Sequence, residues 1–483
     1  MMSYQKNDLI TLRITDISTD GQGIGKTEDV TFFVKDTVIG DEITASVMKM
    51  KKNYGYARLQ DILKPSPYRV KEQCPCAVQC GGCQLQAMSY EKQLSFKMDK
   101  VLNNLKRIGG FTDIPAEPII RMEDPFHYRN KAQYPVGRNR EGRLTAGFYA
   151  GRTHSIIDHH DCILGKPENR QIIEIVLAYM EKHHIDPYDE ISGEGLVRHI
   201  LTRYGFSTGQ WMVCLILNGR KLPAEQELIQ SLLSIEGMTS ICVNVNQART
   251  NVIMGDKTYT LHGKSYIEDR IGNLLYQISP RAFFQVNPVQ TEKLYNKALE
   301  YAGLTGTETV WDLYCGTGTI SLFLAQKARS VRGVEIIPEA VENAVRNAKL
   351  NHITNAEFFV GKAEEILPLH YNNTGERADV IVVDPPRKGC DASLLDTMAA
   401  MQPERIVYVS CDSATLARDL KILCGKGYRL EKICPTDQFP MTVHVETCCL
   451  LERLRNAKDH VTFTLDMEDY YRIKDAEADK EKR

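Results

Sequence analysis

Apolar and polar residues alternate along short runs in the N-terminal part of the chain. Residues 10–14 and 43–47 each place apolar side chains on one face of a predicted strand, and glycine turns at 20–23 and 40–41 follow or precede them. Several short strands in so short a segment predict a small β-barrel over residues 8–64, of a kind that often binds oligonucleotides. The alternative is a structural barrel that only packs on its neighbours.

The period of the pattern changes to that of a helix over residues 89–108. The apolar positions that share one helix face are Leu94, Met98, Val101, Leu102, Leu105 and Ile108. Gly109 and Gly110 are expected to end the helix. An apolar stripe of this kind is typical of core packing, so we expect this helix to pack on another domain.

From about Gly272 onward, short apolar strands alternate with loops and helices, after a stretch (125–265) that mixes both without an obvious repeat. Such a succession predicts a parallel, doubly wound α/β sheet, because right-handed crossovers place helices between parallel strands. The predicted strands are Thr309–Tyr314, Val331–Ile336, Glu357–Val360, Asp379–Val383 and Arg405–Ser410.

Composition adds that the chain is an ordinary globular one. Its 483 residues are 43% hydrophobic and 25% charged, and the sequence shows neither a signal peptide nor the ~18 consecutive apolar residues of a membrane span. Fourteen cysteines in such a chain favour metal or catalytic roles over disulfides. We therefore expect a cytoplasmic enzyme with no membrane partner, and a monomer.

Net charge (−2) does not indicate a nucleic-acid binder, but local charge does. Between Arg129 and Arg152 the chain carries six basic side chains and one acid, Glu141, interleaved with aromatic residues. Basic and aromatic side chains together can hold phosphates and stack on unpaired bases. A solvated β-rich surface is an equally good interpretation of this segment alone.

A cofactor site is predicted at the carboxyl ends of the parallel strands. Asp312–Thr319 ends the first strand with a G-x-G turn, and Glu335 ends the second, where a carboxylate can accept the two ribose hydroxyls of a nucleoside. The loop lacks both the third glycine of a dinucleotide fingerprint and the Lys-Ser/Thr of a P-loop. A nucleoside without a diphosphate, such as S-adenosylmethionine, fits this pattern.

Asp384-Pro385-Pro386-Arg387 ends the fourth predicted strand, close to that cofactor site. A similar loop, with an aromatic residue after two prolines, holds exocyclic amines in amino-group methylases. Arg387 stands at the aromatic position here, which weakens that alternative.

Cys411 ends the fifth predicted strand and precedes a helix. At such a position we expect the helix field to favour the thiolate. Carbon 5 of uracil reacts with a sulfonium methyl only after a thiolate has added at carbon 6, and a base must then remove the carbon 5 proton. Glu446, in a β-rich run further on, could supply that base; taken alone, Cys411 would more often be a structural thiol and Glu446 a surface acid.

These motifs together resemble the RNA (uracil-5-)-methyltransferases, most closely those that act on 23S ribosomal RNA. The resemblance runs from about residue 8 to 455 and rests on six ordered motifs: Cys-x5-Cys-Gly-Gly-Cys-Gln, Phe284–Asn287, Asp312–Thr319, Asp384–Lys388, Ser410–Asp419 and His444–Glu446. It implies that Cys411 is the nucleophile and Glu446 the base, and that the barrel is a TRAM domain. The implied S-adenosylmethionine contacts are Gln285, Tyr314, Glu335 and Asp384.

The resemblance also accounts for a group of cysteines. Cys74, Cys80, Cys83 and the distant Cys162 match the family's four ligands of a 4Fe-4S cluster, which cysteine thiolates hold. A Cys₄ zinc site is the physical alternative. Cys76 stands among the ligands and complicates their assignment.

The expected organisation is an α/β Rossmann-like methyltransferase domain with an N-terminal OB-like barrel and a central α+β iron–sulfur domain. The expected ranges are 1–66 for the barrel, 67–268 for the central domain, 269–459 for the methyltransferase and 460–483 for a charged tail. The expected partner is RNA, with 23S ribosomal RNA favoured because transfer-RNA enzymes of the family often lack the cluster motif and the barrel. A transfer-RNA enzyme and a non-catalytic iron–sulfur RNA-binding protein are the alternatives.

Overall fold

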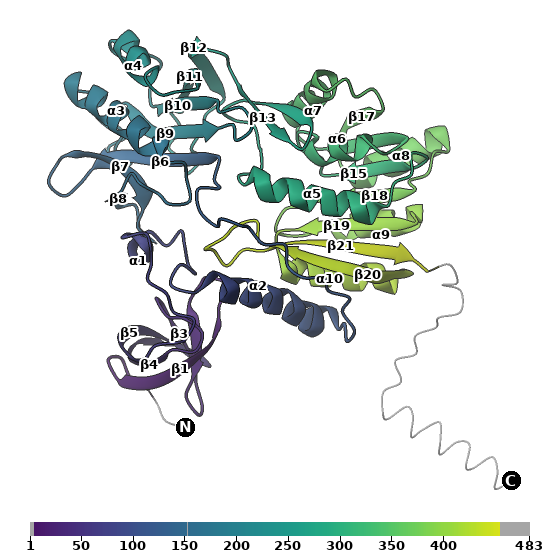
Figure 1. Cartoon of the computed structure of the whole chain (residues 1–483), viewed down its shortest axis with the longest axis horizontal. Helices are drawn as coiled ribbons and strands as arrows, with labels where there is room; N and C mark the ends of the chain where they lie inside the picture. The colour runs from purple at the N-terminus through teal and green to yellow at the C-terminus, as the bar shows by residue number, and fades with distance from the viewer. Residues whose placement is uncertain (1–3, 152, 455–483) are drawn as a thin grey trace, which may run out of the picture.

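The computed structural model describes residues 4–151 and 153–454. The chain forms a small barrel, a central mixed sheet and a C-terminal sheet covered by helices (Figure 1). Arg152 and the predicted tail at 460–483 lie outside the described residues. Within the described ranges, no helix combines the length and the apolar character needed to cross a membrane.

The N-terminal barrel is closed and has five strands in the order β1-β2-β3-β5-β4, as the alternation predicts. Alternate residues of β1 and β4 point inward and form its core, which includes Leu12, Phe32 and Ile43. In β5 the alternation stops after Ala57, so the pattern of the sequence does not identify this strand. The strands are β1 (Leu9–Ile17), β2 (Gly23–Lys26), β3 (Thr31–Val34), β4 (Glu42–Met50) and β5 (Tyr54–Lys64).

Polar contacts fix the barrel to the segment that follows it. The buried carboxylate of Asp41 accepts hydrogen bonds from the backbone N–H of Ser66 (2.9 Å) and from the Nη2 of Arg69 (2.6 Å). A small apolar core then joins the barrel to three later segments, and its members are Ile17, Val38, Leu85, Met88, Phe96 and Val443. The proline-rich stretch at 65–67 is therefore a linker whose position is fixed by contacts on both sides.

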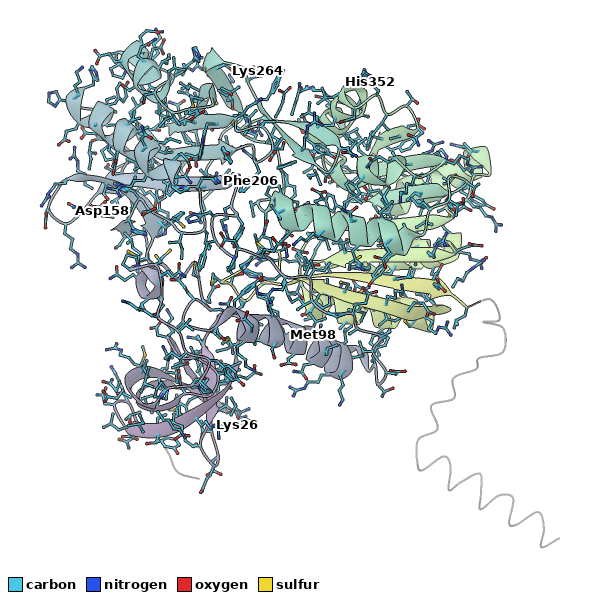
Figure 2. All side chains as sticks on the ribbon, viewed as in Figure 1. Lys26, Met98, Asp158, Phe206, Lys264 and His352 are labelled. Atoms are coloured by element: carbon cyan, nitrogen blue, oxygen red, sulfur yellow. The ribbon has the colours of Figure 1, made fainter. Side chains whose placement is uncertain are left out.

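The helix predicted at 89–108 is present as α2 (Tyr90–Asn104), continued by the π-helical turn η1 (Leu105–Gly109). It follows the short helix α1 (Ala77–Cys80). Val101 and Leu105 pack in the core of the C-terminal sheet, and η1 contacts α10. Met98, labelled in Figure 2, marks α2 where it runs between the barrel and the C-terminal sheet.

The central sheet has seven strands in the order β12-β11-β10-β9-β6-β7-β8. Apolar residues of helices α3 and α4 pack on it and form a separate core. A two-stranded hairpin, β13–β14, leads to the C-terminal sheet. The elements are β6 (Lys131–Arg138), β7 (Leu144–Tyr149), β8 (Ile156–Asp158), α3 (Glu168–Lys182), β9 (Val197–Tyr204), β10 (Trp211–Leu217), α4 (Glu225–Leu232), β11 (Met238–Val245), β12 (Lys257–Gly263), β13 (Ile267–Ile271) and β14 (Leu274–Ile278).

The C-terminal sheet has the order β17-β16-β15-β18-β19-β21-β20, with helices on both faces. The five predicted parallel strands are present, and β21 runs antiparallel between β19 and β20. The elements are α5 (Pro288–Ala302), β15 (Thr309–Leu313), α6 (Thr319–Ala325), β16 (Ser330–Glu335), α7 (Pro338–Leu350), β17 (Ala356–Val360), α8 (Ala363–Thr374), β18 (Val380–Val383), α9 (Ala392–Met401), β19 (Arg405–Ser410), α10 (Ser413–Gly425), β20 (Tyr428–Thr436) and β21 (Glu446–Arg453).

Candidate active site

One edge of the C-terminal sheet gathers most of the predicted site residues. Asp312 lies in β15, Glu335 ends β16, Asp384 follows β18 and Cys411 follows β19, so all four lie at or near the carboxyl ends of parallel strands. Because β21 runs antiparallel to β19, its first residue, Glu446, lies at the same edge. Segments more than 130 residues apart thus meet in one place.

Cys411 and Glu446 are neighbours across two adjacent strands. The last paired residues of β19 and β21 are Ser410 and Thr447, and Cys411 and Glu446 stand next beyond them. Glu446 is buried, with 7% of its surface exposed, and it also pairs with Thr436 of β20. The edge therefore brings a thiol and a carboxyl group together.

The surroundings of this pair raise the pKa of both groups. Burial raises the pKa of Glu446 to about 8, and the charge of Asp384 adds to this whereas Arg387 opposes it. Burial likewise raises the pKa of Cys411 to about 12, again with Glu446 and Asp384 adding and Arg387 opposing. Both groups are therefore mostly protonated at neutral pH, with Asp384 and Arg387 close by.

The helix field that was expected to favour the Cys411 thiolate is outweighed by burial, which raises the pKa of this thiol. Asp412 is the N-cap of α10, and its Oδ1 accepts hydrogen bonds from Ala414 N (3.0 Å) and Thr415 N (2.9 Å). The positive end of the helix is thus satisfied by the Asp412 carboxylate. Burial then dominates the acidity of the neighbouring thiol.

The loop that carries Arg387 is held against α10. Thr415 Oγ1 donates a hydrogen bond to the backbone oxygen of Arg387 (3.1 Å). At the end of the same loop, the buried carboxylate of Asp419 accepts from Cys390 N (2.8 Å) and from the hydroxyl of Tyr408 (2.6 Å). Arg387 therefore extends from a loop with a fixed backbone, with its side chain exposed.

The G-x-G turn after β15 lies against Glu335. The carboxylate of Glu335 accepts hydrogen bonds from Gly316 N (3.1 Å) and Ile337 N (3.0 Å). Gly318 has a positive φ of 79°, and a Cβ there would lie only 2.9 Å from that of Ala344. Glycine is required at this turn because a side chain would clash with α7 and strain the backbone.

Two carboxyl groups, the buried Asp312 and the half-buried Asp384, stand beside this turn. Burial raises the pKa of both Asp312 and Asp384 to about 7. Ser321 donates a hydrogen bond to Asp312 Oδ2 (2.5 Å), whereas Asp312 Oδ1 has no hydrogen-bond partner among the described residues. Together with Glu335 they form an acidic site suited to a ligand that carries positive charge.

Gln285 and Tyr314 lie on different sides of this site. The side chain of Gln285 lies beside the buried hydroxyl of Tyr295, which is 3.0 Å from Thr319 Oγ1 at the start of α6. Tyr314 follows β15 with a positive φ of 67° and packs on the opposite core, near Cys390. Gln285 thus joins the acidic site through Tyr295, and Tyr314 borders it from the other face of the sheet.

Sequence reasoning missed several residues of this edge. Tyr295 occupies a helical core position, so no pattern distinguishes it from a packing residue. Ile336 and Ile337 directly follow Glu335 and are 59% and 53% exposed, which leaves apolar surface that a nucleoside base could cover. Burial lowers the pKa of His444 to about 4, with Arg387 and Lys100 adding, so this half-buried imidazole is neutral. In the sequence, the apolar pair Ile336-Ile337 directly after the acid-ended strand was the available signal for a ligand-binding surface.

The predicted cysteine ligands line a separate, mainly apolar pocket. We call it the cysteine pocket, and the side chains that line it include Cys74, Cys76, Cys80, Cys83, His159 and Cys162. Gln86 supports it, since its Oε1 accepts a hydrogen bond from Cys74 N (2.7 Å), and His159 Nε2 lies within hydrogen-bond distance of Cys74 Sγ (3.6 Å). Segments some 80 residues apart thus place their thiols around one space.

As positioned, these thiols do not form a metal site. Within residues 4–151 and 153–454, no group of three or more His, Cys, Asp or Glu side chains is arranged to hold a metal ion. Burial raises the pKa of Cys74, Cys80 and Cys83, that of Cys83 to about 12.

Comparison with known proteins identifies the two parts of the chain. The family model of tRNA (uracil-5-)-methyltransferases matches residues 89–454, and that of the TRAM domain matches residues 5–59. A protein of Halalkalibacterium halodurans described as an uncharacterized RNA methyltransferase is 50% identical over 92% of this chain and 97% of its own length. A protein of Clostridium tetani with the same description is 49% identical over the same shares.

One solved structure is similar over most of the chain. It is the Pyrococcus abyssi tRNA (uracil-54, C5)-methyltransferase in complex with S-adenosyl-L-homocysteine, with a TM-score of 0.74 and 29% identity. It covers 92% of this chain and all of its own. The chain therefore belongs to the RNA (uracil-5-)-methyltransferases, a family of S-adenosylmethionine-dependent enzymes, and it carries a TRAM domain at its N-terminus.

Proposed function

We propose that this enzyme methylates carbon 5 of a uridine in 23S ribosomal RNA, with Cys411 as nucleophile and Glu446 as base. The observation that carries the proposal is the adjacency of these two residues at the edge of the sheet, one a half-buried thiol and the other a buried carboxyl group. Members of the enzyme family need such a pair, because uracil must be activated at carbon 6 before carbon 5 can react.

The chemistry follows from the two roles. The Cys411 thiol first loses its proton to solvent, and the resulting thiolate forms a bond to carbon 6 of uracil. The displaced electron pair then makes carbon 5 nucleophilic. Carbon 5 takes the methyl group from the sulfonium of S-adenosylmethionine, which leaves S-adenosylhomocysteine. The Glu446 carboxylate then accepts the carbon 5 proton, the carbon 6–sulfur bond breaks, and the thiolate is released. The proton finally passes to solvent, and the enzyme is unchanged.

We assign the acidic site at the strand ends to S-adenosylmethionine. Asp312, Glu335 and Asp384 surround the G-x-G turn, and the unpartnered Asp312 Oδ1 suits a donor group of the ligand. A sulfonium carries a fixed positive charge, so this acidic site favours it electrostatically. Gln285 and Tyr314 are the other proposed contacts.

The affinity for S-adenosylmethionine is expected to decrease as the pH is lowered. Asp312 and Asp384 have pKa values raised to about 7, so both carboxylates gain protons as pH drops through neutrality. The ratio of S-adenosylmethionine to S-adenosylhomocysteine affinity should decrease by up to about tenfold from pH 8 to pH 6. Calorimetric titration with both ligands checks this, because they differ at the sulfonium.

The variant Asp384→Asn provides the control for that titration. Its affinity ratio should change less with pH, since one of the two titrating groups has been removed. A wild-type ratio that stays constant over this pH range would contradict the acidic cofactor site.

The class of RNA is the finer part of the proposal. Ribosomal RNA is favoured by the barrel and the cysteine motif, both of which this chain has. A transfer-RNA substrate is the second candidate, because the similar Pyrococcus abyssi enzyme is described as a tRNA (uracil-54, C5)-methyltransferase. Mapping 5-methyluridine in 23S and transfer RNA from cells that lack the gene, with and without complementation, distinguishes the two candidates.

We further propose that the cysteine pocket holds a 4Fe-4S cluster through Cys74, Cys80, Cys83 and Cys162. Its support is the match of these four cysteines to the family's ligand motif and the apolar pocket that all four line. As positioned the thiols do not form a metal site, so assembly of the cluster would have to draw them together. Hydrogen bonds to the sulfurs and limited solvent access both suit such a cluster. The methyl transfer needs no electrons, so the cluster would stabilise the fold or face the RNA.

Protein prepared without oxygen is expected to be brown, with an absorbance near ~400 nm that air removes. Cys83→Ala should lose the iron, as measured by metal analysis, whereas Cys76→Ala should keep it. A colourless protein that contains zinc would instead establish the zinc alternative.

A further inference from the structure

The loop that leads to Glu446 has little backbone pairing of its own. This loop, residues 437–445, connects β20 to β21, and Glu446 is the first residue of β21. Met441 at its centre has a positive φ of 67°, an uncommon conformation for a residue with a side chain. Glu446 itself pairs with Thr436, so the position of its side chain depends on this pairing and on what holds the neighbouring loop from outside.

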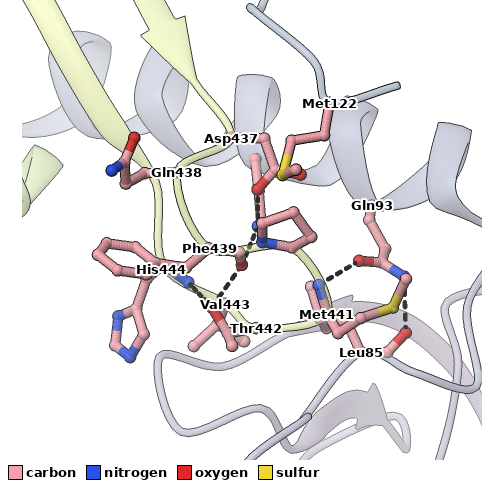
Figure 3. A network of polar contacts seen from close by, with 12 residues as sticks. Leu85, Gln93, Met122, Asp437, Gln438, Phe439, Met441, Thr442, Val443 and His444 are labelled. Carbon is pink, nitrogen blue, oxygen red and sulfur yellow. Dashed lines mark hydrogen bonds and ion pairs between the residues drawn. The ribbon is translucent and has the colours of Figure 1, made fainter. Parts of the chain in front are cut away.

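Much of that support comes from one face of α2, more than 300 residues earlier in the chain. Lys97 is fully buried and forms an ion pair with the equally buried Asp437 (2.5 Å). Its Nζ also donates a hydrogen bond to the backbone oxygen of Phe439 (3.0 Å). Figure 3 shows Asp437 and Phe439 side by side in this network.

Two further side chains of α2 continue the contact along the loop. Gln93 Oε1 accepts a hydrogen bond from Met441 N (3.1 Å), while its Nε2 donates to Leu85 O (3.1 Å). Lys100 Nζ donates to Val443 O (2.9 Å). Figure 3 shows the Gln93 amide bonded to both Met441 and Leu85.

The spacing of these contacts is regular on both partners. Residues 93, 97 and 100 are four and three apart, so they share one face of the helix. They contact residues 437, 439, 441 and 443, which is every second residue of the loop. We call Gln93, Lys97 and Lys100 the α2 clamp, and its last contact lies three residues before Glu446.

A purely stabilising role is a poor explanation for its centre. A buried ion pair costs desolvation, and apolar residues of similar volume are often as stabilising. Buried charges are best explained where they fix one arrangement among several, since an unpaired charge in any other arrangement is unfavourable. Here the arrangement fixed is that of the loop, and the group at the loop's end is the buried carboxyl of Glu446.

We propose that Lys97 is a positioning residue for Glu446, and that the α2 clamp sets the geometry of proton removal from carbon 5. This inference rests on the proposed role of Glu446 as base. It makes α2, which packs beside the barrel, part of the machinery that completes the reaction. Cys411 and the acidic cofactor site lie on other elements, and among the described residues the hydrogen bonds of Lys97 go only to Asp437 and Phe439, so attack and methyl transfer should not depend on Lys97.

The test separates the second half of the reaction from the first in the full-length protein. RNA that contains 5-fluorouridine has fluorine at carbon 5 in place of the hydrogen that the base would remove. The thiol and the methyl group can still add, but no base can remove the fluorine, so formation of the adduct does not need the base. In Lys97→Met, which keeps the length of the side chain, turnover on ordinary RNA should fall by roughly tenfold or more. The rate of 5-fluorouridine adduct formation should stay near that of the wild type, and a covalent adduct should accumulate on ordinary RNA.

The controls keep each outcome decisive. Lys92→Met changes a lysine of the same helix that lies over the ring of Tyr68, away from the loop, and should behave as wild type. Asp437→Asn keeps the shape of the ion pair and serves as second variant should Lys97→Met not fold. A turnover that stays at the wild-type level, or that falls by the same factor as adduct formation, would overturn the inference.

Glu446→Gln distinguishes this failure from that of the proposed function. If Glu446→Gln accumulates the adduct and neither Lys97→Met nor Asp437→Asn does, only the positioning role of Lys97 is wrong. If Glu446→Gln accumulates none, the assignment of the base fails and the positioning role fails with it.

Discussion

Replacing Cys411 by alanine is expected to abolish methyl transfer while leaving the affinity for S-adenosylmethionine nearly intact. Without the sulfur no bond to carbon 6 can form, so carbon 5 stays unreactive, and the loss should reach roughly 10⁴-fold or more. The proposed cofactor contacts are other residues, and Asp384, the one of them that lies close to Cys411, keeps its carboxyl group in the variant. Methyl incorporation from labelled cofactor and calorimetric titration measure the two quantities separately.

Cys424→Ala is a matched control for this prediction. Cys424 is a partly buried thiol near the C-terminal end of α10, the helix that follows Cys411, and it is remote from the sheet edge. This variant should keep its turnover. Activity of Cys411→Ala near the wild-type rate would show that Cys411 is not the nucleophile.

Replacing Glu446 by glutamine is expected to trap the covalent intermediate. Glutamine has nearly the same shape, and the carboxyl it replaces is already largely neutral at pH 7 because burial raises its pKa to about 8. The variant should therefore fold. Thiol addition and methyl transfer can proceed, but the carbon 5 proton has no acceptor, so turnover should drop by about 10²- to 10⁴-fold.

The trapped species is visible as a slowly migrating enzyme–RNA band on a denaturing gel. Glu452→Gln, at the exposed far end of the same strand, should give no such band. The double variant Cys411→Ala, Glu446→Gln should also give none, because the bond to RNA needs the sulfur. Full turnover of Glu446→Gln would mean that another group removes the proton.

The sequence predicted the fold well wherever a period was strong. The five parallel strands of the C-terminal sheet were found within one residue or so, because each is an apolar run followed by a turn and a helix. The β-rich run around Glu446 was noted, but the places of β20 and β21 in the sheet were not predicted, since the order of strands in a sheet depends on long-range pairing that no local pattern records. The alternation in β5 stops halfway, where its residues face solvent.

The site was predicted in its parts but not in its charges. Strand ends indicated that Asp312, Glu335, Asp384 and Cys411 lie along one edge, and the antiparallel return of β21 adds Glu446. The acidity of Cys411 was misjudged because a helix N-terminus was considered without its cap, Asp412. Burial, which depends on the whole fold, outweighs the local helix field there.

The contacts of α2 could not be predicted at all. Lys97 interrupts an otherwise apolar stripe, and a lysine on a helix is usually exposed. Only the three-dimensional structure shows that Asp437 meets it 340 residues later and that both are buried. Partners at such separation leave no spacing rule in one sequence.

The position of β21 has a consequence for the order in which the protein is made. In the finished sheet β21 lies between β19 and β20, although both of these strands are synthesised before it. Since neighbouring strands lie about 4.8 Å apart, β19 and β20 must be separated by the width of one strand when β21 joins the sheet. This gap is filled by the last strand of the described chain, which begins with Glu446. A nascent chain on the ribosome holds its thiol and its three acidic strand ends early, yet it lacks the carboxyl group beside the thiol until its final strand inserts.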